Sequence, residues 1–238
     1  MTSDLNAQRA YYDRRWTATG DVNPLEQERA TVILGLLRRT GLSRPRILDL
    51  GCGRGRLTAM VAELGPATGI DLSGEAIAAA RAQWPSTEWI AGDVFSVALP
   101  AGAFDAVVSQ EVIEHVEDQP RYLDVAADAL RPGGFLVLTT PNRWVQERRS
   151  RAEHEAWGLQ PIEKWLDRVE LRRLLGRRFR TLGLRTIIPG YGSRGALAAL
   201  NAPKLRRALG VLGLGGAYDA MRCGLGMGLH LVAFAQRR

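Results

Sequence analysis

The segment ILDLGCGRGRLTAMVAEL at residues 47–64 joins a short apolar run to an amphipathic stretch through three closely spaced glycines. ILDL is typical of a buried strand and RLTAMVAEL of a helix. Gly51, Gly53 and Gly55 have no side chains, which lets a ligand approach the bare backbone. The loop amides and the helix N-terminus would offer hydrogen bonds and partial positive charge to an acidic group. The segment therefore predicts a ligand-binding loop between a strand and a helix.

The same order of strand and helix continues along the chain. Short apolar runs typical of strands lie at 46–50, 67–72, 87–94, 104–110, 135–140, 180–190 and 228–236. Helix-like segments separate the first five runs, which implies parallel pairing in an α/β sandwich. Between the fifth and sixth runs, four apolar residues have helical spacing: Ile162, Trp165, Leu166 and Val169.

No internal repeat or long linker divides the chain, so we expect a single domain at 1–238. Residues 41–145 hold the glycine loop and the first five strands, and 146–238 would form a substrate-side half. Residues 1–40 and the Gly/Ala/Leu-rich insert at 191–226 are expected to form helical caps.

Composition narrows the class of protein. Of the 238 residues, 46% are apolar, which is enough for a sizeable core. No uncharged apolar stretch reaches the length of about 18 residues needed for a membrane span, and the N-terminal residues lack an apolar signal core. Two cysteines are too few for a disulfide framework, so we expect a cytoplasmic protein.

The net charge of +7 is unevenly distributed. Residues 1–142 carry 13 basic and 18 acidic side chains, whereas 143–185 carry 12 and 6, and 186–238 carry 7 and 1. A basic C-terminal part would suit a nucleic acid, an anionic membrane surface or an acidic substrate. An arginine-rich solvated face is an equally good explanation.

Three acids indicate which ligand the glycine loop would hold. The loop departs from the dinucleotide-binding pattern, because Arg56 stands where the third glycine should be. Asp49, Asp71 and Asp93 lie at the ends of the first three strands. That much negative charge disfavours a pyrophosphate and favours a ligand with a cationic centre, an amine, a ribose and an adenine.

The segments ILDLGCGRG, GIDLS and AGDV, followed by QEVIEHVED and LRPGGFLVLTTPN, resemble class I S-adenosylmethionine (SAM)-dependent methyltransferases. The resemblance covers roughly residues 40–145. It implies a Rossmann-like, seven-stranded, mostly parallel sheet flanked by helices, with the last strand antiparallel. It also implies SAM as the cofactor and S-adenosylhomocysteine (SAH) as the product.

The same resemblance implies roles at the methionine end of the cofactor. Gly51 and Gly53 would bring backbone up to the methionine portion, with Asp49 near its amino group. In the N-terminal segment AYYDRRW, Tyr12 or Trp16 would fold over the cofactor or simply pack as ordinary aromatic residues.

The resemblance also implies roles at the nucleoside end. Asp71 would hold the ribose hydroxyls, with Leu72 against the adenine. Asp93 would accept a hydrogen bond from the adenine amino group, with Val94 beside the ring. Gln110 would face the sulfonium.

A hydroxyl acceptor needs a base, or a metal that lowers its pKa. Glu111, Glu114 and His115 would share one face of a helix. This E-x-x-E-H pattern is similar to that of ubiquinone-biosynthesis O-methyltransferases, where it is associated with divalent metal. A Mg²⁺ site, a base or substrate contact at His115, and a purely structural role therefore stay open. His154 is the second candidate base, and His230 in the last strand is interpreted as structural.

The acceptor is expected to be a small molecule, methylated on a hydroxyl oxygen. The rim after the fifth strand holds four arginines that would favour an anionic acceptor: Arg143, Arg148, Arg149 and Arg151. A lipid-linked or secondary metabolite fits as well, and C- or N-methylation stays open. So do an RNA- or protein-modifying enzyme and a SAM-binding protein without catalysis. Nucleic acid is not expected, since no RNA-binding module is evident. The insert at 191–226 would lie on an anionic bilayer, or act as a lid or dimer contact.

Overall fold

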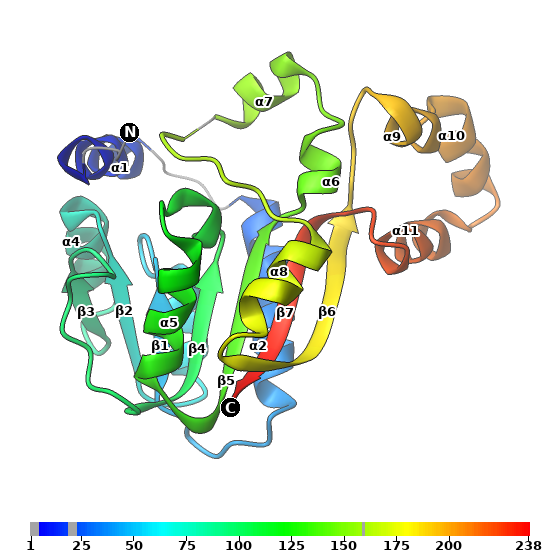
Figure 1. The fold of residues 1–238 in the computed structure, drawn as a ribbon. Helices are drawn as coiled ribbons and strands as arrows, with labels where there is room; N and C mark the ends of the chain where they lie inside the picture. The colour runs from blue at the N-terminus through cyan, green and yellow to red at the C-terminus, as the bar shows by residue number, and fades with distance from the viewer. Residues whose placement is uncertain (1–4, 19–22, 159) are drawn as a thin grey trace.

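The structure, a computed structural model, describes residues 5–18, 23–158 and 160–238. Its strands are β1 Ile47–Leu50, β2 Ala67–Asp71, β3 Glu88–Ala91, β4 Phe104–Gln110, β5 Leu130–Pro141, β6 Phe179–Pro189 and β7 Gly228–Arg237. They form one seven-stranded sheet in the order β3-β2-β1-β4-β5-β7-β6 (Figure 1). The pairs from β1 to β5 are parallel, and β7 runs antiparallel to β5 and β6. This confirms the expected sheet.

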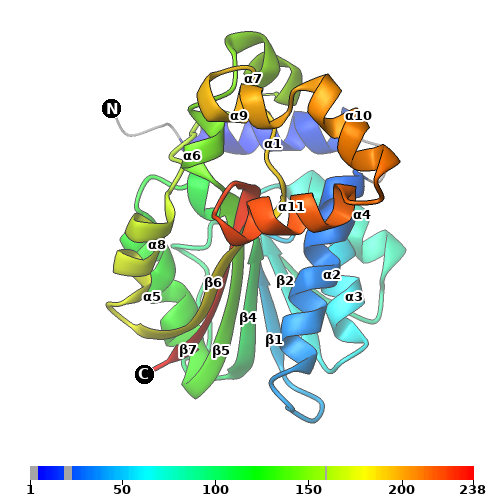
Figure 2. The same cartoon turned by 90° about the vertical axis from the view of Figure 1, so that its right-hand side faces the viewer.

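Helices cover both faces of this sheet. They are α1 Leu5–Ala18, α2 Pro24–Arg38, α3 Arg56–Ala62, α4 Gly74–Gln83, α5 Gln119–Ala129, α6 Arg143–Gln146, α7 Arg151–Trp157, α8 Arg168–Leu175, α9 Gly195–Leu200, α10 Pro203–Val211 and α11 Gly215–Gly224, with a 3₁₀ turn, η1, at Ile113–His115. Figure 2 shows α2 and α3 on one face and α5 and α8 on the other. The helices α1, α7, α9 and α10 lie beyond the carboxyl ends of the parallel strands.

The strands are apolar on both sides because each side packs against helices. All four residues of β1 are buried. Leu123 of α5 and Leu171 of α8 belong to the core on one face. Ile33 of α2 and Leu57 of α3 belong to the core on the other. The carboxyl ends of β1 to β5 are thereby held rigidly along one edge, where the loops can form a site.

Residues 1–40 were expected to form a helical cap, and for α2, one of the two helices in this segment, this prediction is wrong. Ile33, Leu34 and Leu37 of α2 are buried, and α2 packs in the helical layer rather than over the sheet edge. Its burial stripe comes from apolar residues at helical spacing. Only α1 lies at the edge. Residues 1–4 and 19–22 of the predicted cap fall outside the described residues, and the division of the chain at 41 and 146 stays a prediction.

The helical spacing of Ile162, Trp165, Leu166 and Val169 suggests a helix that includes all four residues, and this interpretation is wrong. The helix α8 begins only at Arg168, because the Asp167 carboxylate caps it by accepting from the backbone amides of Val169 and Glu170. Val169 is 68% exposed, so it is not part of a buried stripe. Leu166, by contrast, is buried in a non-helical segment that bridges to Asn142 after β5.

The insert between β6 and β7 is helical, as expected, and consists of α9, α10 and α11. It is anchored by Arg222, a fully buried side chain that donates to the Gly190 carbonyl and to the Asn201 side chain. Helix α11 packs against β6. In the part of the chain that the structure describes, no helix is long and apolar enough to cross a bilayer.

Candidate active site

A pocket of about 450 Å³ lies at the carboxyl ends of β1 to β4. We call the side formed by the strand ends and the glycine loop the strand-end lobe: Asp49, Gly51, Gly53, Asp71, Leu72, Asp93, Val94, Gln110 and Val112. We call the side formed by α1, η1, α7 and the segment before α8 the outer lobe: Gln8, Tyr12, Arg15, Glu114, His115, His154, Gln160, Glu163 and Trp165. All nine predicted cofactor-binding residues and both candidate bases line this one pocket.

The glycine loop needs glycine for both space and backbone conformation. Gly51 has a φ of +78°, and a Cβ atom there would lie 2.4 Å from Val112. Gly53 has a φ of +53°, and a Cβ atom there would lie 2.7 Å from the ring of Trp16 on α1. Side chains at either position would clash and strain the backbone. The loop therefore presents bare main chain to the pocket, beneath the Trp16 ring.

Asp71, at the end of β2, is held by the loop that it supports. Its carboxylate accepts from the backbone amides of Gly53 at 2.7 Å and Ser73 at 2.9 Å. Burial raises its pKa, and these two amides oppose that rise. The Ser73 hydroxyl in turn donates to Asp13 at 2.6 Å, which attaches α1 to this end of the pocket.

Asp49 is a buried carboxyl group that faces the pocket. The Thr58 hydroxyl donates to it at 2.6 Å. Burial raises the pKa of Asp49 to about 7, although Thr58 opposes the rise. Among the described residues no cationic side chain pairs with it. A buried carboxyl group without a cation suits a ligand that brings its own positive charge.

Gln110 and Asp93 complete the strand-end lobe. The Gln110 amide donates to the Glu26 carbonyl at 3.3 Å, while its side-chain oxygen is buried and has no hydrogen-bond partner among the described residues. Such an orphaned acceptor indicates a ligand donor or water at this position. Asp93 accepts from the Phe95 amide and the Ser96 hydroxyl and so closes its own turn.

The expected helix through Glu111, Glu114 and His115 is absent, and this prediction was wrong. Glu111 has a φ of +57°, in the left-handed region, and only the short turn η1 follows it. The Glu111 carboxylate is instead engaged by groups from other segments of the chain. It makes a 2.7 Å ion pair with His230 and lies 3.8 Å from Arg29. The described residues contain no group of three or more His, Cys, Asp or Glu placed to hold a metal ion.

His115 projects into the outer lobe in one defined tautomer. Its Nδ1 lies 2.8 Å from the Ile162 carbonyl, which can only accept, so Nδ1 carries the proton. Its Nε2 accepts from the Gln160 amide at 2.7 Å. Burial lowers the pKa of His115, and the Ile162 carbonyl opposes this. The ring is therefore neutral at neutral pH, with the Nε2 lone pair directed into the pocket.

Glu114 lies beside His115 and is fully buried. The Thr140 hydroxyl donates to one oxygen at 2.9 Å, and the other oxygen lies 3.6 Å from His115 Nε2. Burial raises the pKa of Glu114 well above its usual value, and the negative charge of Glu111 adds to the rise. Burial thus favours the uncharged acid form of this side chain within the outer lobe.

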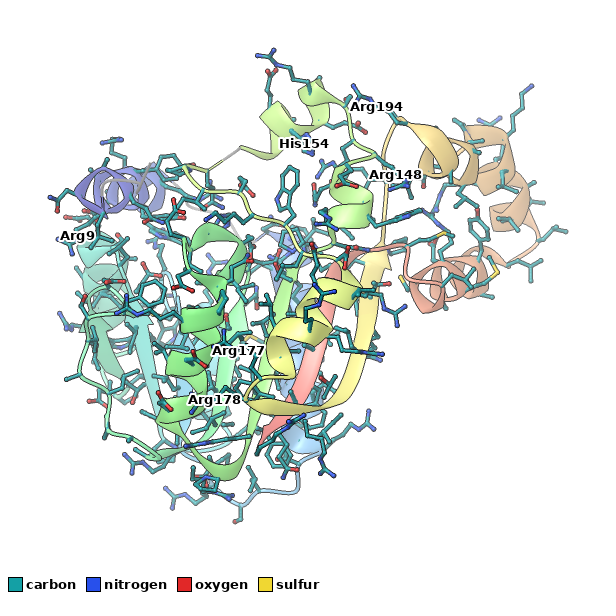
Figure 3. The ribbon with its side chains drawn as sticks, in the orientation of Figure 1. Arg9, Arg148, His154, Arg177, Arg178 and Arg194 are labelled. Atoms are coloured by element: carbon teal, nitrogen blue, oxygen red, sulfur yellow. The ribbon has the colours of Figure 1, made fainter. Side chains whose placement is uncertain are left out.

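His154 on α7 also borders the outer lobe (Figure 3). Its ring stacks on Trp165 with centroids 5.1 Å apart. Its Nε2 is buried and has no hydrogen-bond partner among the described residues. Burial lowers its pKa, so this ring is neutral as well. His154 Nε2 is therefore available to a ligand in this lobe, whereas His115 Nε2 is engaged by the Gln160 amide.

The four rim arginines do not form the predicted anion site, since none of them lines the pocket. Arg143 pairs with Asp167 and Glu170. The remaining three are also engaged outside the pocket: Arg148 lies over the Trp144 ring, Arg149 over the Tyr191 ring, and Arg151 pairs with Glu155. The prediction failed because protein acids and aromatic rings, rather than the pocket, engage these four guanidinium groups.

A second correction concerns the insert. No residue of 191–226 is among those that line the pocket, so α9 to α11 do not form a lid over it. Figure 1 shows these helices beside β6, at the far edge of the sheet from α1. The lid at this end is α1, which Gln8 fastens by donating to the His115 carbonyl at 2.9 Å.

Several lining residues had no sequence signal. Gln160 and Glu163 come from an irregular segment, and Gln8 comes from a polar helix. A cluster of three side chains joins distant segments: Arg29 of α2, Glu111 in the loop after β4, and His230 of β7. The distance between Arg29 Nη1 and His230 Nε2 is 3.2 Å. Although burial alone would raise it, the charges of His230 and Arg29 lower the pKa of Glu111 to about 2. Contacts across such sequence separations cannot be read from local spacing.

Comparison with known proteins agrees with this architecture. Residues 48–138 match the model of a family described as a methyltransferase domain. A ubiquinone biosynthesis O-methyltransferase of Xanthomonas oryzae pv. oryzae is 37% identical over 147 residues, which is 59% of this chain and 62% of the relative. One from Aromatoleum aromaticum is 35% identical over 137 residues, 55% of this chain and 58% of the relative. The chain thus matches less than two thirds of the length of these curated relatives.

Solved structures share the fold over nearly the whole chain. N-methyltransferase NodS from Bradyrhizobium japonicum, in complex with SAH, is 21% identical with a TM-score of 0.63, covering 97% of this chain and 98% of that one. Magnesium protoporphyrin IX methyltransferase from Synechocystis, with bound SAH, is 17% identical with a TM-score of 0.64, covering 99% and 100%. At these identities the likeness establishes the fold alone.

Proposed function

We propose that this chain, whose residues 48–138 match a family described as a methyltransferase domain, is a class I SAM-dependent methyltransferase that methylates a hydroxyl oxygen of a small acceptor. The observation that carries the proposal is the neutral His115, whose Nε2 lone pair faces the outer lobe. The likeness to ubiquinone biosynthesis O-methyltransferases supports oxygen as the acceptor atom.

The strand-end lobe fits SAM. The buried Asp49 carboxyl suits the amino group of its methionine portion, against the bare backbone of Gly51 and Gly53. Asp71 would hold the ribose hydroxyls with its remaining lone pairs, since each of its oxygens accepts from one amide. The orphaned oxygen of Gln110 would face the sulfonium.

Contacts to the adenine would come from three residues at the far side of this lobe. Leu72 and Val94 would lie against the two faces of the ring, and Asp93 would accept from its amino group. Tyr12 and Trp16 on α1 would cover the cofactor, since Trp16 already packs on Gly53. Bound there, SAM supplies an electrophilic methyl group on a positively charged sulfur.

The outer lobe would bind and deprotonate the acceptor. The acceptor hydroxyl takes the place of the Gln160 amide at His115 Nε2, which then accepts its proton. The Ile162 carbonyl keeps Nδ1 protonated and stabilises the imidazolium that forms. The Trp165 ring would pack against an apolar part of the acceptor. His154, stacked on that ring, is the second candidate base.

An uncharged hydroxyl fits this lobe better than an anion. The outer lobe contains two acidic side chains, Glu114 and Glu163, and one arginine, Arg15, and the four rim arginines do not line the pocket. A phenol, or a lipid-linked or secondary metabolite with a free hydroxyl, meets these conditions. The acidic side chains also favour one second candidate, an amine acceptor methylated on nitrogen, because carboxylates attract an ammonium group.

The test is a turnover screen with paired acceptors. The purified protein is given SAM and matched phenols, benzoates and benzylamines, and SAH formation is measured together with the methylated product. Methylation of phenols at oxygen would support the proposal, and turnover of benzylamines alone would establish the amine alternative. Failure of every acceptor despite tight SAH binding would contradict catalysis on small molecules and leave a SAM-binding protein.

Metal dependence is tested in the same assay. Because the Glu111 carboxylate already pairs with His230 and lies beside Arg29, we expect a chelator to leave turnover unchanged. Loss of turnover in EDTA, restored by added Mg²⁺, would contradict the assignment of His115 as a base that acts without metal. A cytoplasmic location stays a prediction.

A further inference from the structure

Exposed apolar side chains are concentrated on the insert between β6 and β7. Ten large apolar residues are exposed among the described residues, and six of them lie within 205–225: Leu205, Val211, Leu212, Leu214, Met221 and Leu225. Val211 is 83% exposed and Leu212 67%. Single exposed apolar residues are ordinary, but a group of them on one segment marks an interaction surface.

The helices of the insert present these residues on stripes. Leu205 and Leu212 lie seven positions apart at α10, and Leu214 and Met221 lie seven apart at α11. Residues two turns apart share one helix face. No residue of α10 is buried, and although α10 contacts α11, Leu205 and Leu212 remain exposed. The sequence nevertheless has apolar residues at these exposed positions.

The charge of the insert distinguishes between the partners that could cover this surface: a second copy of the chain, an RNA or a lipid bilayer. Residues 191–226 hold five basic side chains and one acidic one, Asp219, which already pairs with Arg206. Arg194, Lys204 and Arg207 are exposed beside the apolar residues. A second copy of the same surface would oppose like charges. An RNA would pair with the cations but leave the apolar side chains in water, whereas an anionic bilayer accommodates both.

The position of the insert is compatible with docking on a flat surface. Figures 1 and 2 show α9 and α10 at the same end of the molecule as α1 and α7, which border the outer lobe. Arg9 on α1 and Arg194 before α9 both lie at this end, whereas Arg177 and Arg178 lie toward the opposite end (Figure 3). A bilayer at this end would lie on the same end of the molecule as the pocket.

We propose that α9 to α11 form a docking surface for an anionic lipid bilayer, with the apolar stripes inserted among the acyl chains and the basic side chains at the headgroups. The protein is then a peripheral membrane protein that holds its pocket beside the bilayer. This inference rests on the insert alone and holds whichever acceptor is methylated.

The test is co-sedimentation of the full chain with vesicles of phosphatidylcholine, with and without about one third phosphatidylglycerol. Binding is expected only to the anionic vesicles and should weaken as salt is added. Replacing two cations in Lys204→Gln/Arg207→Gln should lower the partition coefficient by roughly 30-fold, at about fivefold for each basic residue. Val211→Asp/Leu212→Asp should abolish binding.

Matched controls come from α8, which carries an exposed apolar residue and exposed arginines outside the insert. Val169→Asp and Arg173→Gln should leave vesicle binding unchanged. Because α10 buries no residue, its variants should fold, which circular dichroism and retained SAH binding would verify. Absence of binding to anionic vesicles overturns the proposal. So does binding that survives the insert variants, a dimer abolished by Val211→Asp/Leu212→Asp, or salt-sensitive binding to RNA alone.

Discussion

The two lobes of the pocket are assembled in different ways. The strand-end lobe uses residues that sit at the ends of successive parallel strands, so Asp49, Asp71 and Gln110 converge because the sheet brings the strand ends together. The outer lobe draws on α1, η1, α7 and an irregular segment, which meet only through side-chain contacts such as Gln8 to the His115 carbonyl. The first lobe follows from strand topology and the second from tertiary packing.

This difference separates what each lobe would do. The strand-end lobe offers bare backbone and buried carboxyl groups, which suit a ligand that carries a positive charge and is held in one position. The outer lobe offers two imidazole rings, His115 and His154, beside the buried Glu114 with its raised pKa, and these groups suit proton transfer. Variants in the two lobes should therefore affect different quantities, binding of SAH in one case and turnover in the other.

The largest effect is expected at His115. His115→Gln keeps a polar side chain but removes the base, so kcat for the acceptor found by the screen should fall by about 10²- to 10⁴-fold. The Kd for SAH, measured by calorimetry, should change less than about twofold, since the base acts outside the strand-end lobe. His154→Gln is the matched control, with kcat reduced far less. Near-normal kcat in His115→Gln would remove the proposed base.

The next largest effect is expected at Asp71. In Asp71→Asn an amide replaces the acceptor for the Gly53 and Ser73 amides and for the ribose hydroxyls. The Kd for SAH should rise about 100-fold, as expected for loss of charge-assisted hydrogen bonds in a buried site. Asp124→Asn, on the surface of α5, is the control and should bind SAH normally. Normal affinity in Asp71→Asn would contradict the ribose assignment.

A smaller, graded effect is expected from pH. The pKa of Asp49 is raised to about 7, so its carboxyl is protonated below that pH and ionised above it. Only the ionised form attracts the ammonium of SAH, so affinity should be constant at higher pH and weaken by up to about tenfold per pH unit below 7. Calorimetry across this range measures the slope. Asp49→Asn should bind weakly at every pH, and a flat profile in the unaltered protein would contradict the assignment.

The smallest effect is expected at Arg143. Its guanidinium pairs with Asp167 and Glu170 and lies outside the pocket, so Arg143→Gln should alter acceptor KM by less than about twofold. Steady-state kinetics with the same acceptor would measure this. A large rise in KM confined to acceptors that carry a carboxylate would reinstate the anionic acceptor that the sequence predicted.

Much of the fold and of the strand-end lobe was predictable, because local periodicity decides both. The strand patterns placed Asp49, Asp71, Asp93 and Gln110 at one edge of the sheet. The glycine pattern predicted a loop with bare backbone, and Gly51 and Gly53 do lie too close to neighbouring side chains to carry a Cβ atom. The outer lobe was only partly predictable. His115 and His154 were found because histidines are rare here, whereas Gln160 and Glu163 gave no signal.

The failed predictions share a physical cause. Helical spacing of Glu111, Glu114 and His115 assumed a helix that the left-handed backbone of Glu111 prevents. That conformation is stabilised by Arg29 and His230, which come from distant segments. The apolar spacing of 161–179 was likewise overridden by the Asp167 cap and by burial of Leu166 against Asn142.

The sequence by itself determined the α/β sheet, the glycine loop and the row of strand-end acids, because these depend on residues close together in the chain and on the fixed geometry of parallel strands. Tertiary structure decided the tautomer of His115, the raised pKa of Glu114, the pairing of Arg143 with Asp167 and Glu170, and the exposure of the insert. The first three depend on partners more than ten residues away and the last on how the insert packs, which local patterns do not encode.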